Sequence, residues 1–132
     1  MARVQHVTIT VPDEGLLPVV ESFYQALGGI SQTRPEKLEA DTPGRWLGFD
    51  GTQVHLVIGS PVADPAHFAI DLGSEFDAVR ELLAARKVEV REARELWGAR
   101  RCFVRDPAGN RVELIERAPG TLEAAPGLER PP

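Results

Sequence analysis

The alternation of apolar and polar residues predicts that the same order of strands and helices occurs twice in this chain. Val7, Ile9 and Val11 alternate with polar residues near the N-terminus, as in a β-strand that has one buried face. A stretch with apolar residues at helical spacing follows and ends in the pair Gly28 and Gly29, which suits a helix C-terminus. The predicted elements are a strand at residues 4–12, a helix at 16–29 and strands at 30–34, 45–50 and 52–59. The first half is therefore expected to be β-α-β-β-β.

The same order of elements begins again at residue 67. Phe68, Ile70 and Leu72 alternate with polar or small residues, and a segment with helical spacing follows. The predicted elements are a strand at 67–72, a helix at 74–87 and strands at 88–92, 100–106 and 111–116. The segment 91–101 is in addition a candidate loop over a cleft. Such internal repetition constrains the whole architecture and favours a pseudo-two-fold arrangement.

The repeat predicts an α+β fold. Two tandem βαβββ modules are expected, with the helices on one face of the strands and the polar side chains on the other. We expect a single domain over residues 1–117, with modules at about 3–60 and 65–117. Residues 118–132 are rich in Pro, Gly and Ala and lack a packed pattern, which predicts a flexible tail.

Composition narrows the class of protein. Of the 132 residues, 42% are hydrophobic and 27% are charged, a balance typical of a folded globular domain. The net charge of −5 argues against a general nucleic-acid-binding protein, which needs a basic surface to neutralise phosphates. No apolar run is long enough to cross a bilayer and the N-terminus has no signal-peptide layout, so we expect no membrane association and a cytoplasmic location. The single cysteine, Cys102, fits a reducing compartment and is interpreted as a buried structural thiol.

Four polar residues fall at equivalent positions of the two halves. Superposing the halves places His6 on His67 and His55 on Glu113, and the three histidines are the only ones in the chain. Because side chains alternate across a strand, all four residues point away from the face that packs against the helices. Imidazole and carboxylate groups bind Zn²⁺, Ni²⁺, Co²⁺, Fe²⁺ or Mn²⁺, so the pattern predicts a divalent metal ion of open identity. Gln53 and Arg111 neighbour His55 and Glu113 along their strands and are candidate hydrogen-bond partners of the ligands.

The paired modules, the histidine near the start of each half and the ending DPAGNRVELIE resemble the vicinal oxygen chelate superfamily. This superfamily includes glyoxalase I, fosfomycin-resistance transferases, methylmalonyl-CoA epimerase, extradiol dioxygenases and bleomycin-resistance proteins. The resemblance extends over about residues 3–117. It implies that the two modules form a curved mixed sheet around a metal-containing cleft, with the helices on the outer face. It implies that His6, His67 and Glu113 match the ligands shared by most metal-dependent members. His55 then stands where related enzymes have a glutamate or a glutamine, either as a direct ligand or as an outer partner.

The resemblance implies a glyoxalase-like, divalent-metal-dependent lyase or isomerase that acts on a small molecule through a metal-stabilised oxyanion. Glu113 is the expected catalytic residue, because a carboxylate can move a proton when its coordination loosens. The alternatives are a non-catalytic small-molecule (antibiotic) binding or resistance protein, and an Fe(II) extradiol-type dioxygenase. Members of this length commonly form homodimers, which implies a metal site that takes His6 and His55 from one protomer and His67 and Glu113 from the other.

Three further residues are candidates for substrate binding. Arg101 and Phe103 share the polar-side register, because Cys102 and Val104 make the better core face. Arg101 suits a substrate carboxylate or phosphate, and a solvated surface arginine is the other interpretation. Trp46 falls on the same side and is interpreted either as a hydrophobic wall of the site or as simple packing.

Overall fold

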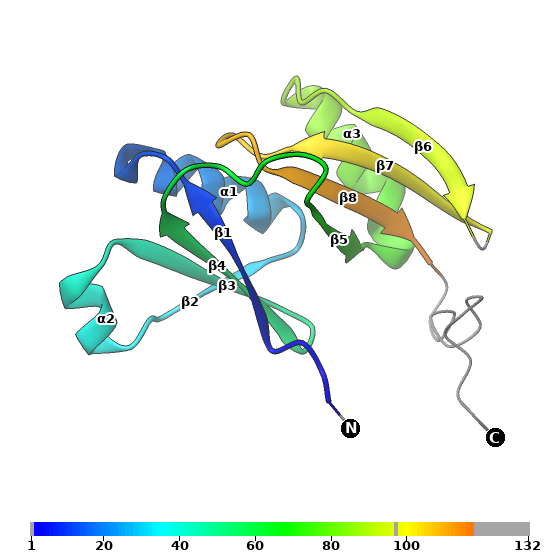
Figure 1. Ribbon diagram of the computed structural model, residues 1–132. Coiled ribbons are helices and arrows are strands. Elements are labelled where there is room, and N and C mark those ends of the chain that lie inside the picture. Colours follow the sequence, from blue (N-terminus) through cyan, green and yellow to red (C-terminus); the bar gives the residue numbers. More distant parts are fainter. Residues whose placement is uncertain (1, 97, 118–132) are drawn as a thin grey trace. The chain divides into compact units, whose positions relative to one another are not determined.

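The computed structural model describes residues 2–96 and 98–117, in which the predicted order of elements occurs twice (Figure 1). The first half consists of β1 (His6–Val11), a 3₁₀ turn (Glu14–Leu16), α1 (Leu17–Ala26), β2 (Ile30–Gln32), α2 (Glu36–Asp41), β3 (Gly44–Phe49) and β4 (Thr52–Ile58). The second half consists of β5 (Phe68–Asp71), a 3₁₀ turn (Gly73–Glu75), α3 (Phe76–Ala85), β6 (Arg91–Leu96), β7 (Ala99–Arg105) and β8 (Arg111–Glu116). None of the helices in these residues has the length and apolarity that crossing a membrane requires.

Each half forms its own four-stranded sheet, in the orders β1-β4-β3-β2 and β5-β8-β7-β6. Both sheets are mixed, because the first strand of each half runs parallel to the last one while the hairpins β3–β4 and β6–β7 are antiparallel. The predicted α+β class and the tandem βαβββ modules are thereby confirmed. The expected curved sheet consists of two separately hydrogen-bonded sheets.

In the first half, helix α1 covers one face of its sheet (Figure 1). Pro18 lies in the first turn of the helix, where its missing N–H costs no hydrogen bond. The apolar stripe of α1 meets the apolar alternation of β1, β3 and β4, as the periodicity predicts. The buried residues of this core are Ile9, Val11, Leu17, Val20, Phe23, Tyr24, Leu27, Leu47, Val54 and Leu56. The opposite face of the sheet carries the polar side chains.

The second half repeats this packing with helix α3. The buried hydrophobic residues of this second core are Ile70, Leu72, Phe76, Val79, Leu83, Ala99, Cys102, Val104, Val112, Leu114 and Ile115. Cys102 is fully buried, as expected of a structural thiol, and its burial raises the pKa of the thiol. A raised pKa keeps the sulfur protonated and unreactive.

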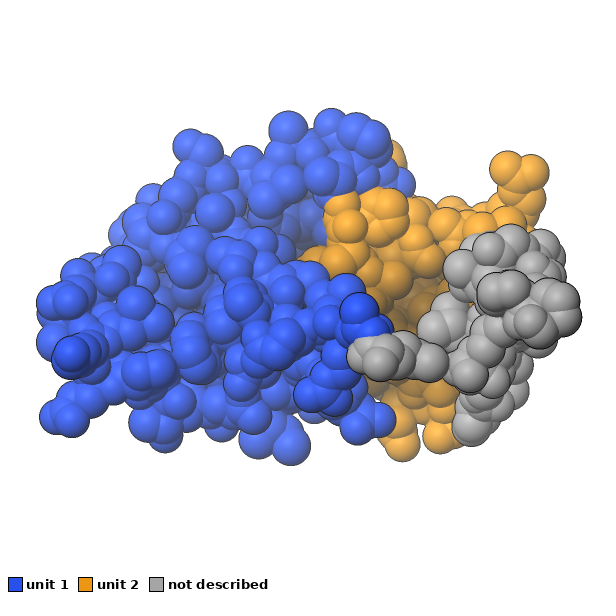
Figure 2. All heavy atoms as spheres, turned by 60° about the horizontal axis from the view of Figure 1, so that its bottom comes forward, with its two compact units in different colours: residues 1–66, 105–111 blue, residues 67–104, 112–132 orange. Residues whose placement is uncertain are grey.

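The chain divides into two compact units that do not coincide with its two halves (Figure 2). Unit 1 comprises residues 1–66 and 105–111, and unit 2 comprises residues 67–104 and 112–132. The segment 105–111, which runs from the end of β7 to the start of β8, therefore groups with the first half of the chain.

Asp106 holds the segment 105–111 within unit 1. Its Oδ1 accepts hydrogen bonds from the backbone N–H groups of Ala108 at 2.9 Å and Asn110 at 3.0 Å. Its Oδ2 accepts hydrogen bonds from the Tyr24 hydroxyl at 2.7 Å and from Asn110 Nδ2 at 3.0 Å. Asn110 Nδ2 also donates to the carbonyl oxygen of Thr10 at 2.8 Å. The DPAGN sequence thus forms a buried polar junction with α1 and β1.

Two elements differ from the prediction. Helix α2 was not predicted, because its six residues include a single large apolar side chain, Leu38, and give no helical periodicity. The strand expected at 88–92 begins instead at Arg91, where β6 pairs with β7 across an irregular register. The expectation of a loop at 91–101 is wrong, because the described residues of this segment lie in these two strands or in the turn between them. The predicted flexible tail, residues 118–132, lies outside the described residues.

Candidate functional site

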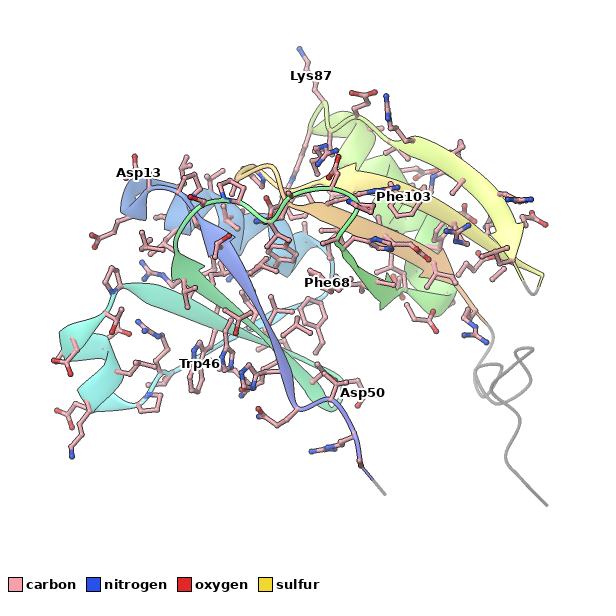
Figure 3. All side chains as sticks on the ribbon, viewed as in Figure 1. Asp13, Trp46, Asp50, Phe68, Lys87 and Phe103 are labelled. Atoms are coloured by element: carbon pink, nitrogen blue, oxygen red, sulfur yellow. The ribbon has the colours of Figure 1, made fainter. Side chains whose placement is uncertain are left out.

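On unit 1, the sheet face opposite α1 carries a stack of three aromatic rings. The strand register places Thr8 and Trp46 beside His55, one on each side. The ring centroids of His6 and His55 lie 4.1 Å apart with an interplanar angle of 13°. The ring centroids of Trp46 and His55 also lie 4.1 Å apart, with an angle of 3° (Figure 3 labels Trp46). His55 is therefore the middle ring of the stack and is only 8% exposed.

Side-chain amides hold the edges of this stack. Gln53 Oε1 lies 2.8 Å from His55 Nε2, and Gln53 Nε2 donates to Gln32 Oε1 at 2.7 Å. Gln5 Oε1 lies 2.5 Å from His6 Nδ1. Because an amide oxygen only accepts hydrogen bonds, His55 donates from Nε2 in this arrangement, and its Nδ1 carries the lone pair when the ring is neutral. Gln53 is thus a hydrogen-bond partner of His55, at the position expected from the sequence.

The surroundings of His55 favour its neutral form. Burial lowers the pKa of His55, and the nearby charges of His6 and Arg34 lower it further. A buried ring next to other cations loses solvation and gains repulsion when it takes up a proton. The imidazole therefore stays unprotonated near neutral pH, which is the state that a metal ligand requires.

Acidification is expected to destabilise the protein through His55. Its pKa in the folded chain lies below the ordinary value of 6.5, so the unfolded chain binds more protons between these two values. The stabilisation is complete above pH 6.5 and is lost as the pH falls through this window. Thermal midpoints measured against pH should fall more steeply in the wild type than in His55→Gln. Parallel curves for the two proteins would contradict the assignment.

On unit 2, Glu113 lies between a histidine and an arginine. Glu113 Oε1 lies 3.2 Å from His67 Nε2. Arg101 donates from Nε to Glu113 Oε2 at 3.1 Å and from Nη2 to Oε1 at 3.4 Å, and its Nη1 donates to the carbonyl oxygen of Arg94 at 2.8 Å. The side chains of Glu113 and Arg101 are 12% and 14% exposed. The carboxylate is therefore held in one orientation from two sides.

The predicted substrate-binding residues of unit 2, Arg101 and Phe103, lie against the pair formed by His67 and Glu113. Phe103 (labelled in Figure 3) meets His67 edge to face, with ring centroids 5.1 Å apart and an angle of 82°. The Arg101 guanidinium lies 5.6 Å from the centroid of the Phe103 ring. Cys102 and Val104 point into the core, so the expected register of β7 is correct. Arg101 and Phe103 both contact predicted metal ligands, and a contact of either with substrate stays a prediction.

The two pairs occupy equivalent places on the two sheets. Within unit 1 the structure brings His6 to His55, and within unit 2 it brings His67 to Glu113. His55 pairs with Thr8 across β4 and β1, and Glu113 pairs with Ala69 across β8 and β5. Thr8 and Ala69 each lie two residues after the first histidine of their half. Among residues 2–96 and 98–117, no three His, Cys, Asp or Glu side chains form a group that could hold a metal ion. Neither unit alone therefore provides the four-residue set that the sequence suggested.

Arg34 was not singled out from the sequence, although its charge acts on His55. It lies two residues beyond Gln32, which pairs with Trp46 across β2 and β3. Alternation along an extended chain would have placed it on the same face as Trp46. Arg34 is 7% exposed and its Nη1 forms an ion pair with Glu39 Oε2 at 2.8 Å.

Comparisons with known proteins agree with this architecture. The family model described as Glyoxalase/Bleomycin resistance protein/Dioxygenase superfamily matches residues 3–114. A solved glyoxalase family protein from Bacillus anthracis is 25% identical, with a TM-score of 0.78 over 89% of this chain and 97% of that chain. The fosfomycin resistance protein FosX from Listeria monocytogenes is 18% identical, with a TM-score of 0.71 over 90% and 94%. A lactoylglutathione lyase from Agrobacterium tumefaciens is 18% identical, with a TM-score of 0.66 over 88% and 94%.

No curated protein sequence matches the chain. The family model nevertheless spans most of its 132 residues. The solved structures share its fold over nearly their whole length. The chain belongs to the glyoxalase/bleomycin resistance protein/dioxygenase superfamily.

Proposed function

We propose that this chain is a glyoxalase-like enzyme, a divalent-metal-dependent lyase or isomerase that acts on a small molecule. The observation that carries the proposal is the pairing of His6 with His55 and of His67 with Glu113 at equivalent places of two sheets. Membership of the superfamily supports it, since a lactoylglutathione lyase is among the solved structures that share the fold.

The donor groups fit a divalent cation. Three imidazoles and one carboxylate form a set that Zn²⁺, Ni²⁺, Co²⁺, Fe²⁺ and Mn²⁺ all accept. The lowered pKa of His55 supplies a neutral ring, and Gln53 orients that ring as an outer partner of a ligand does. When bound, the cation would polarise a substrate oxygen and stabilise the negative charge that develops on it.

A two-fold homodimer would complete the site. Each unit supplies one pair of ligands, and a two-fold interface repeats every contact between the protomers. In the proposed assembly, His6 and His55 of one protomer join His67 and Glu113 of the partner subunit, so that one dimer holds two equal sites.

Glu113 is the proposed proton-transfer residue. Its two oxygens are held by Arg101 and His67. A carboxylate that is already oriented can accept a substrate proton without losing further conformational freedom. Taking the proton at Oε2 requires Arg101 to release its hydrogen bond to that oxygen. The freed guanidinium is then available to balance negative charge on the substrate. Trp46 and Phe103 would form apolar walls on either side.

Metal analysis of protein purified without a His-tag tests the proposal. The wild type is expected to contain one divalent ion per chain. Glu113→Gln should bind that metal about 100-fold more weakly, because it replaces an anionic ligand by a neutral amide in a site whose neighbours stay in place. Glu116→Gln is the matched control, since Glu116 lies on the same strand but pairs with Arg100.

Metal content and oligomeric state are measured on the same samples. Removal of the metal by a chelator is expected to weaken the dimer in the wild type, as measured by sedimentation. Wild-type protein without stoichiometric metal would sink the proposed function and favour the non-catalytic binding alternative. Equal metal content in Glu113→Gln and Glu116→Gln would exclude Glu113 as a ligand.

A further inference from the structure

Arg34 is a buried cation with an unused hydrogen-bond donor. Its side chain is only 4% exposed, and its Nη1 donates to Glu39 Oε2 at 2.8 Å and to the carbonyl oxygen of Gly44 at 3.3 Å. Its Nε is buried and has no hydrogen-bond partner within residues 2–96 and 98–117. A guanidinium carries five N–H donors in a rigid fork, so the Nε side of this fork is left without an acceptor.

Two glycines make room for long polar side chains on either side of Trp46. A Cβ on Gly44 would lie 3.1 Å from both Cζ and Nη2 of Arg34, so a larger residue would push the guanidinium away. A Cβ on Gly48 would collide with the side-chain amide of Gln32. Gly44 and Gly48 lie two residues before and after Trp46, and therefore on the same face of β3. The guanidinium of Arg34 consequently lies over β3 at one edge of the ring stack.

The charge of Arg34 is only partly balanced. Glu39 contacts it through Nη1 alone, and the Glu39 side chain is 57% exposed, so solvent screens much of its charge. The guanidinium nevertheless lies within electrostatic reach of His55. A buried charge with an unpaired donor is costly, and the cost falls when an anion supplies the missing acceptor. The position of Arg34 therefore favours an anionic group beside the stack formed by Trp46, His55 and His6.

We propose that Arg34 recognises an oxyanion of the substrate, a carboxylate or a phosphate-type group, beside the Trp46–His55–His6 stack. The proposal rests on the proposed function in that it assigns a substrate class to the same site. The fork presents Nε and Nη2 in the geometry that binds two oxygens of one oxyanion side by side. Because Nε is shielded in the ligand-free chain, the guanidinium must shift toward the anion, and its exposed partner Glu39 is the contact that gives way.

A purely structural role makes a different prediction. If Arg34 serves only to anchor α2 through Glu39, then removing either partner of the ion pair should lower stability similarly, and neither change should affect anions. If Arg34 binds an oxyanion, its removal should weaken anion binding, whereas removal of Glu39 should preserve or strengthen it, because Glu39 competes for the same guanidinium. Glu39→Gln is therefore the matched control for Arg34→Gln.

Titration with inorganic phosphate and with acetate, at constant ionic strength set by chloride, tests the proposal. Trp46 is followed by its fluorescence in a Trp97→Phe background, since the chain has only two tryptophans. Arg34→Gln is expected to weaken binding of the preferred anion at least about tenfold, the effect of losing a charged hydrogen-bonded pair. Arg34→Lys, which keeps the charge but loses the fork, should fall between Arg34→Gln and the wild type.

The outcomes separate this proposal from the metal proposal. Titrations are run on metal-free and metal-loaded protein, and the metal content of each variant is measured alongside. Anion binding that depends on Arg34 in metal-free protein supports the oxyanion site even if the metal proposal fails. Wild-type protein that binds neither anion, or Arg34→Gln that binds as the wild type does, overturns it. Equal loss of binding in Glu39→Gln and Arg34→Gln also overturns it, in favour of the anchoring role.

Discussion

Replacing Asp106 by alanine is expected to lower the free energy of unfolding by about 4 kcal/mol, because the substitution leaves several buried donors without an acceptor. The carboxylate accepts four hydrogen bonds, from the backbone N–H groups of Ala108 and Asn110, the Asn110 side-chain amide and the Tyr24 hydroxyl. Asp106 itself is 3% exposed, so water cannot replace these contacts without opening the turn. Urea denaturation followed by circular dichroism measures the change.

Two milder variants divide this effect into its parts. Tyr24→Phe removes the hydrogen bond from the Tyr24 hydroxyl of α1 to Asp106 and is expected to cost about 2 kcal/mol, typical of a bond to a charged acceptor. Asp106→Asn keeps one acceptor oxygen and should fall between Tyr24→Phe and Asp106→Ala. If Asp106→Ala were no more harmful than Tyr24→Phe, the turn at residues 106–110 would be held by something other than this carboxylate.

Replacing Phe76 by alanine is the corresponding test of unit 2, with an expected loss of about 4 kcal/mol in the free energy of unfolding. The ring is fully buried at the start of α3. The guanidiniums of Arg80 and Arg100 lie 5.4 Å and 5.0 Å from its centroid, so the substitution removes cation–π contacts as well as core volume. Denaturant unfolding again gives the measurement.

Leu82→Ala is the control on the same helix. Leu82 is 38% exposed, so its truncation removes little buried surface and is expected to change the free energy of unfolding by less than about 1 kcal/mol. Comparable losses for Leu82→Ala and Phe76→Ala would mean that the apolar face of α3 is not the one that packs on β7 and β8.

The repeated fold could be predicted from the sequence because each half shows the same order of strand and helix patterns independently. The alternation of apolar residues in the strands and their helical spacing in α1 and α3 indicate which face of each element is buried, and the same faces are buried in the structure. Helix α2 and the start of β6 carry mostly polar residues, so no apolar pattern marked them. Their conformation depends on neighbours: β6, for example, is defined by its pairing with β7.

The candidate site was predicted in part. Side-chain parity places His6, His55 and Trp46 on one face, but only the pairing of β1 and β3 with β4 makes them a stack of adjacent rings. The same limit applies to Arg34, whose guanidinium lies against Gly44. Such contacts depend on strand register, which a single sequence does not state. Metal ligation by the two pairs remains a prediction.

The placement of residues 105–111 in unit 1 has a consequence for how the chain is made. During synthesis from the N-terminus, α1 and β1 emerge long before Asp106 and Asn110. The hydrogen bonds from Tyr24 to Asp106 and from Asn110 to the Thr10 carbonyl can therefore form only after residues 106–110 have been synthesised. Unit 1 can complete its polar junction only when nearly all of the described chain is available. A fragment ending at residue 66 would lack the junction, and the two repeats could not be exchanged or produced separately without also moving this turn.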